Sequence, residues 1–407
     1  MSFLGKLFRR NISCKQYDPE KRIGMVMELD TFDKGGLQKV VLDSAVRLNP
    51  AHFDVVIVSI NGGGYWADRA REYGLRVYVL EGAHDIKRYR QILVDNDVKL
   101  SCSHFSRVGY PLFRSLGIPN ITFIHNVYAF LSSTALRHFR QDDKMVDLYI
   151  SVSRKATEYA VKRLGINPAK VVTVPNGLIL DEHSQRAEKA PLVEREEFGI
   201  QPDDYVFLNV ASYNLHKGHY LMAEAMSRLK EKRNDIKLIC IGNVIVPRHV
   251  EAFLAYIKDR NLEDVMIMPG YYPNVESFYQ MADAFLLPSF IEGWSIAMNE
   301  AMFAGKPMVL TDTGGAGEVI ENDDIGLLIP NEYGNVVNLD CELLDELAYN
   351  RRTYSVTDKL VSAMCNFADN REYWKKTGAK GREKLCSRYD FNDVVRKYER
   401  IFFQVLR

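Results

Sequence analysis

Two glutamates eight positions apart are the first groups in this chain whose spacing suggests ligand binding. They begin and end the segment Glu292-Gly-Trp-Ser-Ile-Ala-Met-Asn-Glu300, which follows an apolar run. An ionised carboxylate only accepts hydrogen bonds, so this pair could bind hydroxyl groups on two different rings. Alternatively, Glu300 is a solvated helix residue and Glu292 an N-terminal charge, and the spacing by itself favours that interpretation.

The residues between the two glutamates predict a turn into a helix that runs from about Ser295 to Phe303. Gly293 allows the backbone to approach a ligand closely. The amides of Trp294, Ser295 and Ile296 would lie at the helix N-terminus, where unpaired donors and the helix dipole favour a phosphate. The segment therefore combines acceptors for hydroxyl groups with donors for a phosphate.

The elements that would position this segment alternate along the whole chain. Near-continuous apolar runs such as Val55–Ile60 are typical of parallel strands covered on both faces, and helical patterns separate them. The predicted strands are Ile23–Met27, Val55–Ile60, Val77–Leu80, Lys99–Cys102, Ile121–Ile124, Tyr149–Val152, Val171–Val174, Val206–Ala211, Lys237–Ile241, Val265–Met268, Ala284–Leu287, Met308–Leu310 and Gly326–Ile329. This alternation predicts an α/β fold of two Rossmann-like, doubly wound parallel-sheet domains.

The domain boundaries are visible as changes in composition. With 407 residues, of which 47% are hydrophobic, the chain has material for two cores. We expect a basic amphipathic segment at 1–20, an N-terminal domain at 21–177, a polar linker at 178–200, a C-terminal domain at 201–387 and a final helix at 388–407, with Asn392 as its candidate cap. Two such domains would face a cleft, with ligands at the carboxyl ends of the strands.

Composition excludes several classes of protein. A formal net charge of zero gives no support for a nucleic-acid partner. The six cysteines are scattered without a C-x-x-C pair, which indicates reduced thiols in a cytoplasmic protein. No run approaches the apolar length needed to cross a bilayer. The segment 1–10, which mixes Phe and Leu with Lys and Arg, is consistent either with resting on an anionic membrane surface or with a solvated terminus.

Several short motifs, in this order, resemble the retaining glycosyltransferases of the GT-B fold that are grouped as family 4, also called glycosyl transferases group 1. The resemblance covers roughly residues 21 to 405. Its pieces are Gly35-Gly36-Leu37, His125-Asn126, Val152-Ser153, Val174-Pro-Asn176-Gly177, Lys217-Gly218, Ile241-Gly242, Glu292-x7-Glu300, Ala304-Gly305-Lys-Pro307 and Gly314-Gly315. It implies acceptor binding in the N-terminal domain, nucleotide-sugar binding in the C-terminal domain and a last helix that packs back on the N-terminal domain.

The resemblance implies a catalytic role for three residues. Lys217 would neutralise the departing diphosphate, Glu292 would face the transferred sugar, and His125 would contact its hydroxyl groups at the reacting face. The alternatives are a solvated loop lysine and a satisfied histidine at a strand end. His104, which follows a strand, is a weaker candidate for the acceptor site, and a structural role is equally consistent with the sequence.

The resemblance also implies a set of donor-binding residues. Glu300 would accept hydrogen bonds from the ribose, and the Gly35-Gly36 turn would meet the donor phosphate or sugar, although an ordinary turn is the alternative. The predicted donor site comprises Gly35, Gly36, Asn176, Lys217, Gly242, Tyr271, Glu292, Gly293, Trp294, Ser295, Ile296 and Glu300. Asn176 is also consistent with a simple turn residue in Pro-Asn-Gly.

The chain departs from the family pattern at one position. The family commonly has an arginine five residues before the lysine, and this chain has Ser212 there. Serine cannot supply the charge or the bidentate geometry of a guanidinium, so His216 is a candidate to compensate, or the donor geometry differs. Asp95-Asn-Asp97 matches a bare D-x-D pattern, but it precedes a strand and is better explained as a polar turn. We expect no metal and no cofactor, with the nucleotide sugar as a substrate.

The resemblance implies a retaining hexosyltransferase that uses a UDP- or GDP-linked sugar and a glycan or lipid-linked saccharide, in cell-surface polysaccharide biosynthesis. We expect it in the cytoplasm, peripheral to the inner face of the plasma membrane. Two alternatives remain, a sugar-nucleotide epimerase and a catalytically silent sugar-nucleotide-binding subunit of a transferase complex. Turnover of labelled sugar nucleotides, with and without acceptors, distinguishes them.

Overall fold

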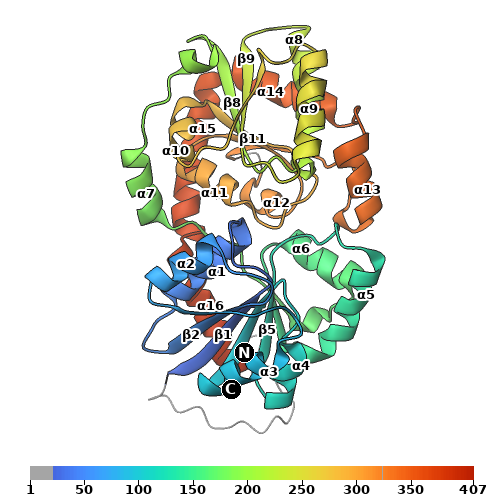
Figure 1. Ribbon diagram of the computed structural model, residues 1–407. Helices are drawn as coiled ribbons and strands as arrows, with labels where there is room; N and C mark the ends of the chain where they lie inside the picture. Colours follow the sequence, from blue (N-terminus) through green and yellow to red (C-terminus); the bar gives the residue numbers. More distant parts are fainter. Residues whose placement is uncertain (1–21, 323) are drawn as a thin grey trace. The chain divides into compact units, whose positions relative to one another are not determined.

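A computed structural model describes residues 22–322 and 324–407 (Figure 1). The predicted N-terminal segment 1–20 lies outside the described residues. The described chain forms two compact units, one of residues 22–125, 132–175 and 392–407, and the other of residues 126–131 and 176–391. Each unit contains its own parallel sheet, as the alternation of apolar runs predicts.

The first unit is built on a seven-stranded parallel sheet within the described residues, in the order β3-β2-β1-β4-β5-β6-β7. Its strands are β1 (Ile23–Leu29), β2 (Phe53–Ser59), β3 (Arg76–Val79), β4 (Val98–His104), β5 (Asn120–Ile124), β6 (Leu148–Ser151) and β7 (Val171–Thr173). Its helices are α1 (Gly36–Arg47), α2 (Tyr65–Glu72), α3 (Ile86–Asp95), α4 (Tyr110–Leu116), α5 (Ser133–Asp142), η2 (Asp143–Met145), α6 (Arg154–Tyr159), η3 (Ala160–Leu164) and η4 (Pro168–Lys170). The order reverses between β1 and β4, where a doubly wound sheet binds its ligands.

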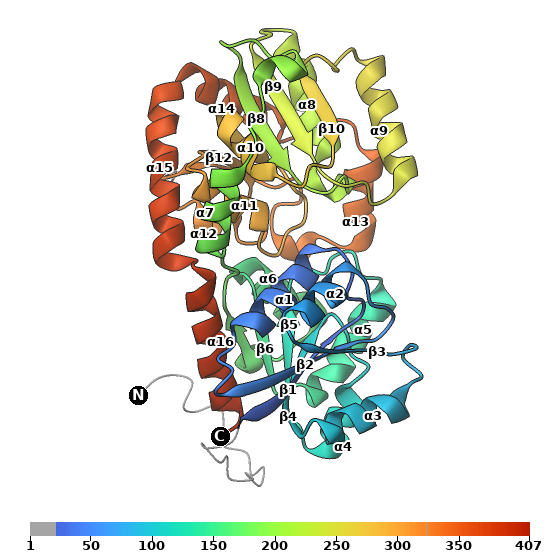
Figure 2. The ribbon, with the colours of Figure 1, turned by 60° about the vertical axis from the view of Figure 1, so that its left-hand side comes forward.

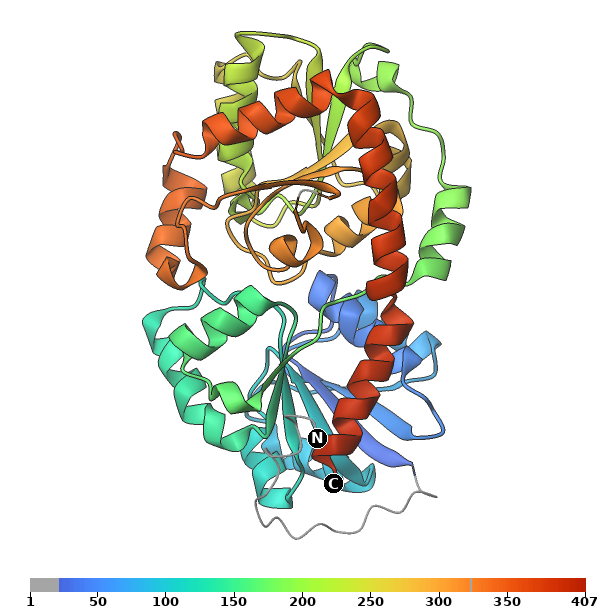
Figure 3. The same ribbon diagram turned by 180° about the vertical axis from the view of Figure 1, so that it is seen from behind.

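The last helix of the chain, α16 (Phe391–Val405), belongs almost entirely to the first unit. Figure 3 shows it lying along the sheet of that unit. The ring of Tyr398 meets Phe123 edge-on at 5.2 Å, and Phe402 meets Phe53 at 5.9 Å. The helix therefore returns to the N-terminal sheet as expected, although it starts one residue before the predicted cap Asn392.

The second unit is built on a six-stranded parallel sheet in the described residues, in the order β10-β9-β8-β11-β12-β13. Figure 2 shows β8, β9 and β10 of this sheet side by side. Its strands are β8 (Tyr205–Val210), β9 (Ile236–Ile241), β10 (Met266–Gly270), β11 (Ala284–Leu287), β12 (Met308–Thr311) and β13 (Gly326–Ile329). Its helices are α7 (Leu180–Lys189), η5 (Arg195–Phe198), η6 (Leu215–Lys217), α8 (His219–Lys230), α9 (Pro247–Asp259), α10 (Val275–Met281), α11 (Ile296–Phe303), α12 (Ala316–Val319), η7 (Val336–Asn338), α13 (Cys341–Asp345), η8 (Glu346–Asn350), α14 (Thr357–Asp369) and α15 (Arg371–Arg388). Here the order reverses between β8 and β11.

The central strands are covered on both faces, because every residue of β1 and of β9 is buried. Each of the thirteen predicted strands is present among the described residues, with ends that shift by one or two positions. The segment 178–200, which we interpreted as a linker, contains the ten-residue helix α7 and the short helix η5. No helix in the described part of the chain is long and apolar enough to cross a membrane.

Candidate functional site

The loop after β11 is held rigidly by side chains from the neighbouring strand ends. Thr311 Oγ1 and Asn331 Nδ2 both donate to the carbonyl oxygen of Ser289, at 2.5 and 3.1 Å. Tyr333 donates its hydroxyl to the carbonyl oxygen of Phe290 at 2.7 Å. All these groups are buried, and buried polar groups that are fully paired fix the local backbone. The loop that carries the first glutamate is therefore preorganised by the sheet itself.

The predicted lysine and the first glutamate are in direct contact, although 75 positions separate them. Lys217 Nζ lies 2.6 Å from Glu292 Oε1, and the Ser289 hydroxyl donates to the same oxygen at 3.0 Å. The side chains of Lys217 and Glu292 are 21% and 12% exposed, so neither is simply solvated. Their loops meet because β8 and β11 are neighbours at the point where the strand order reverses.

The glycine after the lysine is required by the close approach of these two loops. Gly218 has φ +79°, and a Cβ there would lie 2.1 Å from the carbonyl oxygen of Pro288. The amide of Phe290 also donates to the carbonyl oxygen of His216 at 2.9 Å, which joins the loops by their backbones. A side chain at position 218 would push the loops apart and move Lys217 away from Glu292.

Helix α11 starts beside this pair. Ser295 caps it by accepting from the Met298 amide at 3.3 Å, and within the described residues the amides of Trp294, Ser295 and Ile296 donate to no protein acceptor. Unpaired amides and the helix dipole favour an anion here. A small recess at this point is lined by Leu287, Glu292, Ser295, Met298, Leu310, Thr311, Thr313, Gly315 and Ala316.

The side chain of Trp294 packs inside the unit. It is 4% exposed and donates through Nε1 to Asn299 Oδ1 at 3.0 Å, while Asn299 Nδ2 donates to the carbonyl oxygen of Asn176 at 3.2 Å. Tyr389 covers the indole at a ring separation of 4.9 Å. Because the indole is used in packing, the backbone amide is the group of Trp294 that suits contact with a nucleotide-sugar donor. Asn176, itself buried, serves this packing through its carbonyl group.

The second glutamate lies within helix α11, beside Tyr279 and His183. Tyr279 donates its hydroxyl to the carbonyl oxygen of Ala297 at 2.8 Å and lies 3.4 Å from Glu300 Oε2, while His183 Nε2 lies 3.6 Å from Glu300 Oε1. Burial, and then the charge of Glu300, raise the pKa of Tyr279, so its hydroxyl stays a donor. With 15% exposure, Glu300 is not a solvated helix residue. His183 comes from α7, in the segment interpreted as a linker.

The turn that ends in Lys217 packs against helix η8. His216 Nε2 lies 3.7 Å from Asp345 Oδ1, and its ring is 5.4 Å from the ring of Tyr349. Burial lowers the pKa of His216 more than Asp345 raises it, so the imidazole is neutral at pH 7. His216 therefore does not replace the positive charge that is missing at Ser212.

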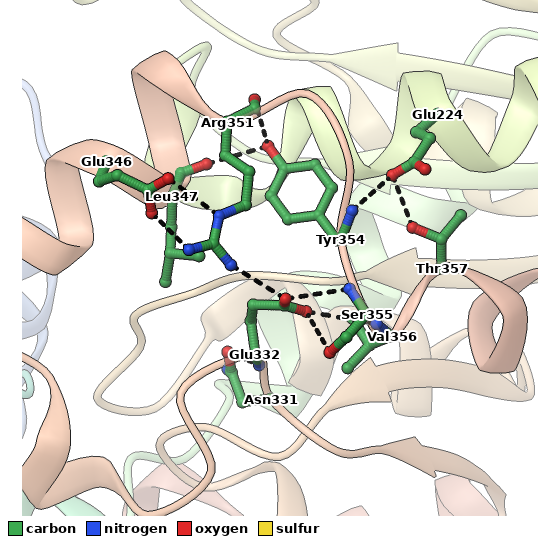
Figure 4. A network of polar contacts seen from close by, with 10 residues as sticks. All are labelled: Glu224, Asn331, Glu332, Glu346, Leu347, Arg351, Tyr354, Ser355, Val356 and Thr357. Atoms are coloured by element: carbon green, nitrogen blue, oxygen red, sulfur yellow. Dashed lines mark hydrogen bonds and ion pairs between the residues drawn. The ribbon is translucent and has the colours of Figure 1, made fainter.

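A partly buried ionic network connects the segment that contains η8 to the rest of the unit (Figure 4). Glu332 pairs with Arg351 at 3.0 Å, and it also accepts from the amides of Ser355 and Val356. Glu224 accepts from the amide of Tyr354 at 2.9 Å and from the hydroxyl of Thr357 at 2.6 Å. These repeated pairings stabilise the segment, and η8 packs against the Lys217 turn through Tyr349 and His216.

In the first unit, the two predicted histidines form a pair. His104 is the last residue of β4, and His125 follows β5 directly. His104 Nδ1 lies 2.9 Å from His125 Nε2, and the His104 ring stacks on Phe123 at 4.4 Å. Burial lowers the pKa of His125 to about 4 and that of His104 well below its usual value, so both rings are neutral at pH 7. His104 is 1% exposed and contacts His125, an arrangement that fits the structural role that the sequence left open beside a place in the acceptor site.

The glycine turn after β1 is joined by hydrogen bonds to the loop after β2. Gly35 caps α1 and Gly36 begins it, with open space where a side chain on Gly36 would be. Phe32 donates its amide to the carbonyl oxygen of Gly62 at 3.1 Å, and the Tyr65 amide donates to Asp33 Oδ1 at 3.0 Å. Sequence reasoning missed the second loop, although three consecutive glycines at 62–64 are a signal for it.

The remaining predicted donor residues lie at the ends of β9 and β10. Gly242 packs so closely on β8 that a Cβ would lie 1.7 Å from the carbonyl oxygen of Ala211, which is a structural reason for glycine. Tyr271 follows β10 and is 66% exposed. Among the described residues no group of three or more His, Cys, Asp or Glu side chains could hold a metal ion.

The chain matches two family models. The model described as "Glycosyltransferase Family 4" matches residues 34–182, and the one described as "Glycosyl transferases group 1" matches residues 193–340. The two matches fall one in each half of the chain and together cover most of it. The second contains both Lys217 and the two glutamates.

Similar proteins point in the same direction. An Escherichia coli UDP-Gal:alpha-D-GlcNAc-diphosphoundecaprenol alpha-1,3-galactosyltransferase is 22% identical over 350 residues, which are 80% of this chain and 89% of that protein. A Campylobacter jejuni N-acetylgalactosaminyltransferase acting on a diphospho-undecaprenol-linked saccharide is 28% identical over 190 residues, 46% of this chain and 48% of that one. Among solved structures, Anabaena HepE with UDP-glucose has a TM-score of 0.76 at 14% identity, covering 93% of this chain and 99% of that chain. A Rickettsia africae glycosyltransferase has a TM-score of 0.75 at 16% identity, covering 95% and 99%.

Proposed function

Because the chain belongs to the glycosyltransferases of family 4 and group 1, we propose that it moves a hexosyl residue from a nucleotide sugar to a glycan or lipid-linked saccharide, with retention of anomeric configuration. The observation that carries this proposal is the contact of Lys217 with Glu292 beside the N-terminus of α11. A cation, unpaired amides and a carboxylate acceptor in one place suit a sugar diphosphate, which carries both phosphate charges and hydroxyl groups.

In the proposed reaction the bound nucleotide sugar replaces the contact between Lys217 and Glu292 with its own contacts to both residues. Lys217 turns from Glu292 to the diphosphate, and Glu292 accepts hydrogen bonds from the sugar hydroxyl groups. The bond between the anomeric carbon and the phosphate oxygen breaks while the acceptor oxygen bonds to that carbon from the same face. The departing phosphate takes the acceptor's proton, so neither glutamate has to act as a base. Lys217 and the α11 amides stabilise the charge that develops on the phosphate, without a metal ion.

Glu300 completes the donor site in this proposal. Its carboxylate, which lies beside Tyr279 and His183, accepts hydrogen bonds from the two ribose hydroxyl groups. A UDP-linked hexose is the proposed donor, supported by the solved neighbour that holds UDP-glucose and by the E. coli relative named for UDP-Gal. Both curated relatives are named for undecaprenol-diphosphate-linked acceptors, which supports a lipid-linked acceptor in polysaccharide biosynthesis. Such a substrate would bring the protein to the inner face of the plasma membrane.

The test is transfer of labelled hexose from UDP- and GDP-sugars to undecaprenyl-diphosphate-linked N-acetylglucosamine, with the product's anomeric configuration read by NMR. We expect transfer from a UDP-hexose, an α-linked product, and activity that survives EDTA. Lys217→Ala should lose most of the transfer activity, whereas Lys359→Ala, at an exposed lysine on α14, should retain it. An epimerised or free sugar formed at full rate without any acceptor would favour an epimerase. Binding without turnover would favour a silent subunit.

A further inference from the structure

His104 has an arrangement that its predicted role does not explain. Its ring is 1% exposed, stacked on Phe123 on one side, and its Nδ1 lies at hydrogen-bond distance from His125 Nε2. The other nitrogen, Nε2, has no hydrogen-bond partner among the described residues. The single polar contact of this buried imidazole is therefore with His125, which follows the neighbouring strand β5.

The pairing restricts where each ring can carry its proton. A neutral imidazole has one N–H and one acceptor nitrogen, so one ring must donate to the other. If His125 donated, His104 would carry its proton on Nε2, which is buried without an acceptor. If His104 donates from Nδ1, only an acceptor nitrogen is left unpaired. Buried N–H groups without an acceptor are rarer in proteins than acceptors that are short of a donor, so the second arrangement is favoured.

We propose that His104 is a positioning residue that fixes the ring orientation and the tautomer of His125, so that His125 carries its proton on Nδ1. Ring stacking supports a fixed orientation of both imidazoles. The Phe123 ring packs against both histidines, with ring centroids 4.4 Å from His104 and 5.8 Å from His125. Tyr398 of α16 meets the Phe123 ring edge-on, with the ring centroids 5.2 Å apart. The last helix of the chain thus packs against the ring on which His104 stacks.

The consequence for chemistry rests on the proposed function. In this tautomer neutral His125 carries its N–H on Nδ1, and a donor of this kind would suit a hydroxyl oxygen of the transferred sugar. It does not present a proton acceptor at that position, and His125 therefore orients the sugar and does not deprotonate the acceptor. Bound hydroxyl groups are positioned best when the donor atom is fixed before they arrive.

The direct test is the ¹⁵N NMR spectrum of the full chain labelled in histidine, with the His125 signals identified by their loss in His125→Gln. In the wild type we expect the Nδ1–H tautomer, which is the opposite of the preference of free histidine. His104→Leu keeps the site apolar and buried but removes the donor, so His125 should revert towards Nε2–H. His104→Asn places an amide near the Nδ1 position and should restore the wild-type signals. His52→Leu, which removes another ring-packed histidine of the same unit, should change nothing at His125.

An Nε2–H tautomer in the wild type, or His125 signals that are the same in the wild type and in His104→Leu, would overturn the proposal. Because this spectrum needs neither substrate nor turnover, it is independent of whether the protein transfers a sugar. Where transfer is measurable, His104→Leu should lower kcat on the order of tenfold, as for loss of one well-oriented neutral hydrogen bond, and His104→Asn should recover most of it. Equal loss in both variants would indicate packing alone and would also overturn the positioning role.

Discussion

Replacing Glu292 by glutamine should strengthen the binding of UDP while it weakens sugar transfer. In the free protein Lys217 is neutralised by Glu292 at 2.6 Å, so a diphosphate must compete with a carboxylate that is already in place. Glutamine has nearly the same shape and can still accept from the Ser289 hydroxyl, but it carries no charge. The substitution therefore frees the charge of the lysine without emptying the site.

The expected size follows from the geometry. Two unit charges 4 Å apart attract by about 4 kcal/mol at an effective dielectric constant of 20, and desolvation offsets most of this for a pair that is 12–21% exposed. A net pairing of about 1 kcal/mol corresponds to roughly fivefold in the dissociation constant of UDP. Transfer should fall by about tenfold or more, because the sugar loses a charged acceptor for its hydroxyl groups.

Isothermal titration with UDP, on the wild type and on Glu292→Gln, measures the first effect. Glu383→Gln, at an exposed position on α15, changes the net charge equally and serves as the matched control. In a Lys217→Met background the gain from Glu292→Gln should shrink, since the coupling of the two residues is then absent. Unchanged or weaker UDP binding in Glu292→Gln, or the same gain in both backgrounds, would refute the idea that the ion pair competes with the diphosphate.

Three further outcomes follow from the same contacts. Lys217→Ala should lower kcat by about 10²–10³-fold, the size seen when one preorganised group that stabilises developing charge is removed, and steady-state kinetics will show whether KM rises alone instead. Gly218→Ala should lower the free energy of unfolding, measured in urea, by roughly 2 kcal/mol or more. The reason is that φ of +79° disfavours a side chain and that a Cβ would lie 2.1 Å from the Pro288 carbonyl oxygen. Gly36→Ala is the control, because it has open space around it and should cost about 1 kcal/mol or less. Burial lowers the pKa of His125 to about 4 and that of His219 to about 3, so below pH 6.5 the unfolded chain takes up protons that the native state does not. The free energy of unfolding should then fall by up to about 1.4 kcal/mol per pH unit for each histidine between pH 6.5 and 4. Urea unfolding at a series of pH values measures this slope, which should be smaller in His219→Asn, and an equal or larger slope in that variant would contradict the prediction.

Local pattern was sufficient for the strands and for helix α11. Runs such as Val55–Ile60 are apolar without alternation, and such runs form central parallel strands wherever two faces must be covered. Ser295 was a good cap because its hydroxyl bonds an amide three residues away, an interaction that depends only on neighbouring residues. In the segment 178–200, which we interpreted as a linker, the sequence did not reveal helix α7, because this helix is mostly polar and buries only His183. The helix depends on packing that composition does not reveal.

What the amino-acid sequence determined by itself was the family, the two-sheet fold and which residues are candidates for chemistry. Only the tertiary structure decided which of these residues touch. Lys217 meets Glu292 because β8 lies next to β11, and His104 meets His125 because β4 lies next to β5. Strand order is set by how whole layers of helices and strands pack, so no local pattern encodes it. For the same reason the sequence left two roles open for His104, one in the acceptor site and one in the structure. Its buried ring makes its only polar contact in the described residues with another histidine.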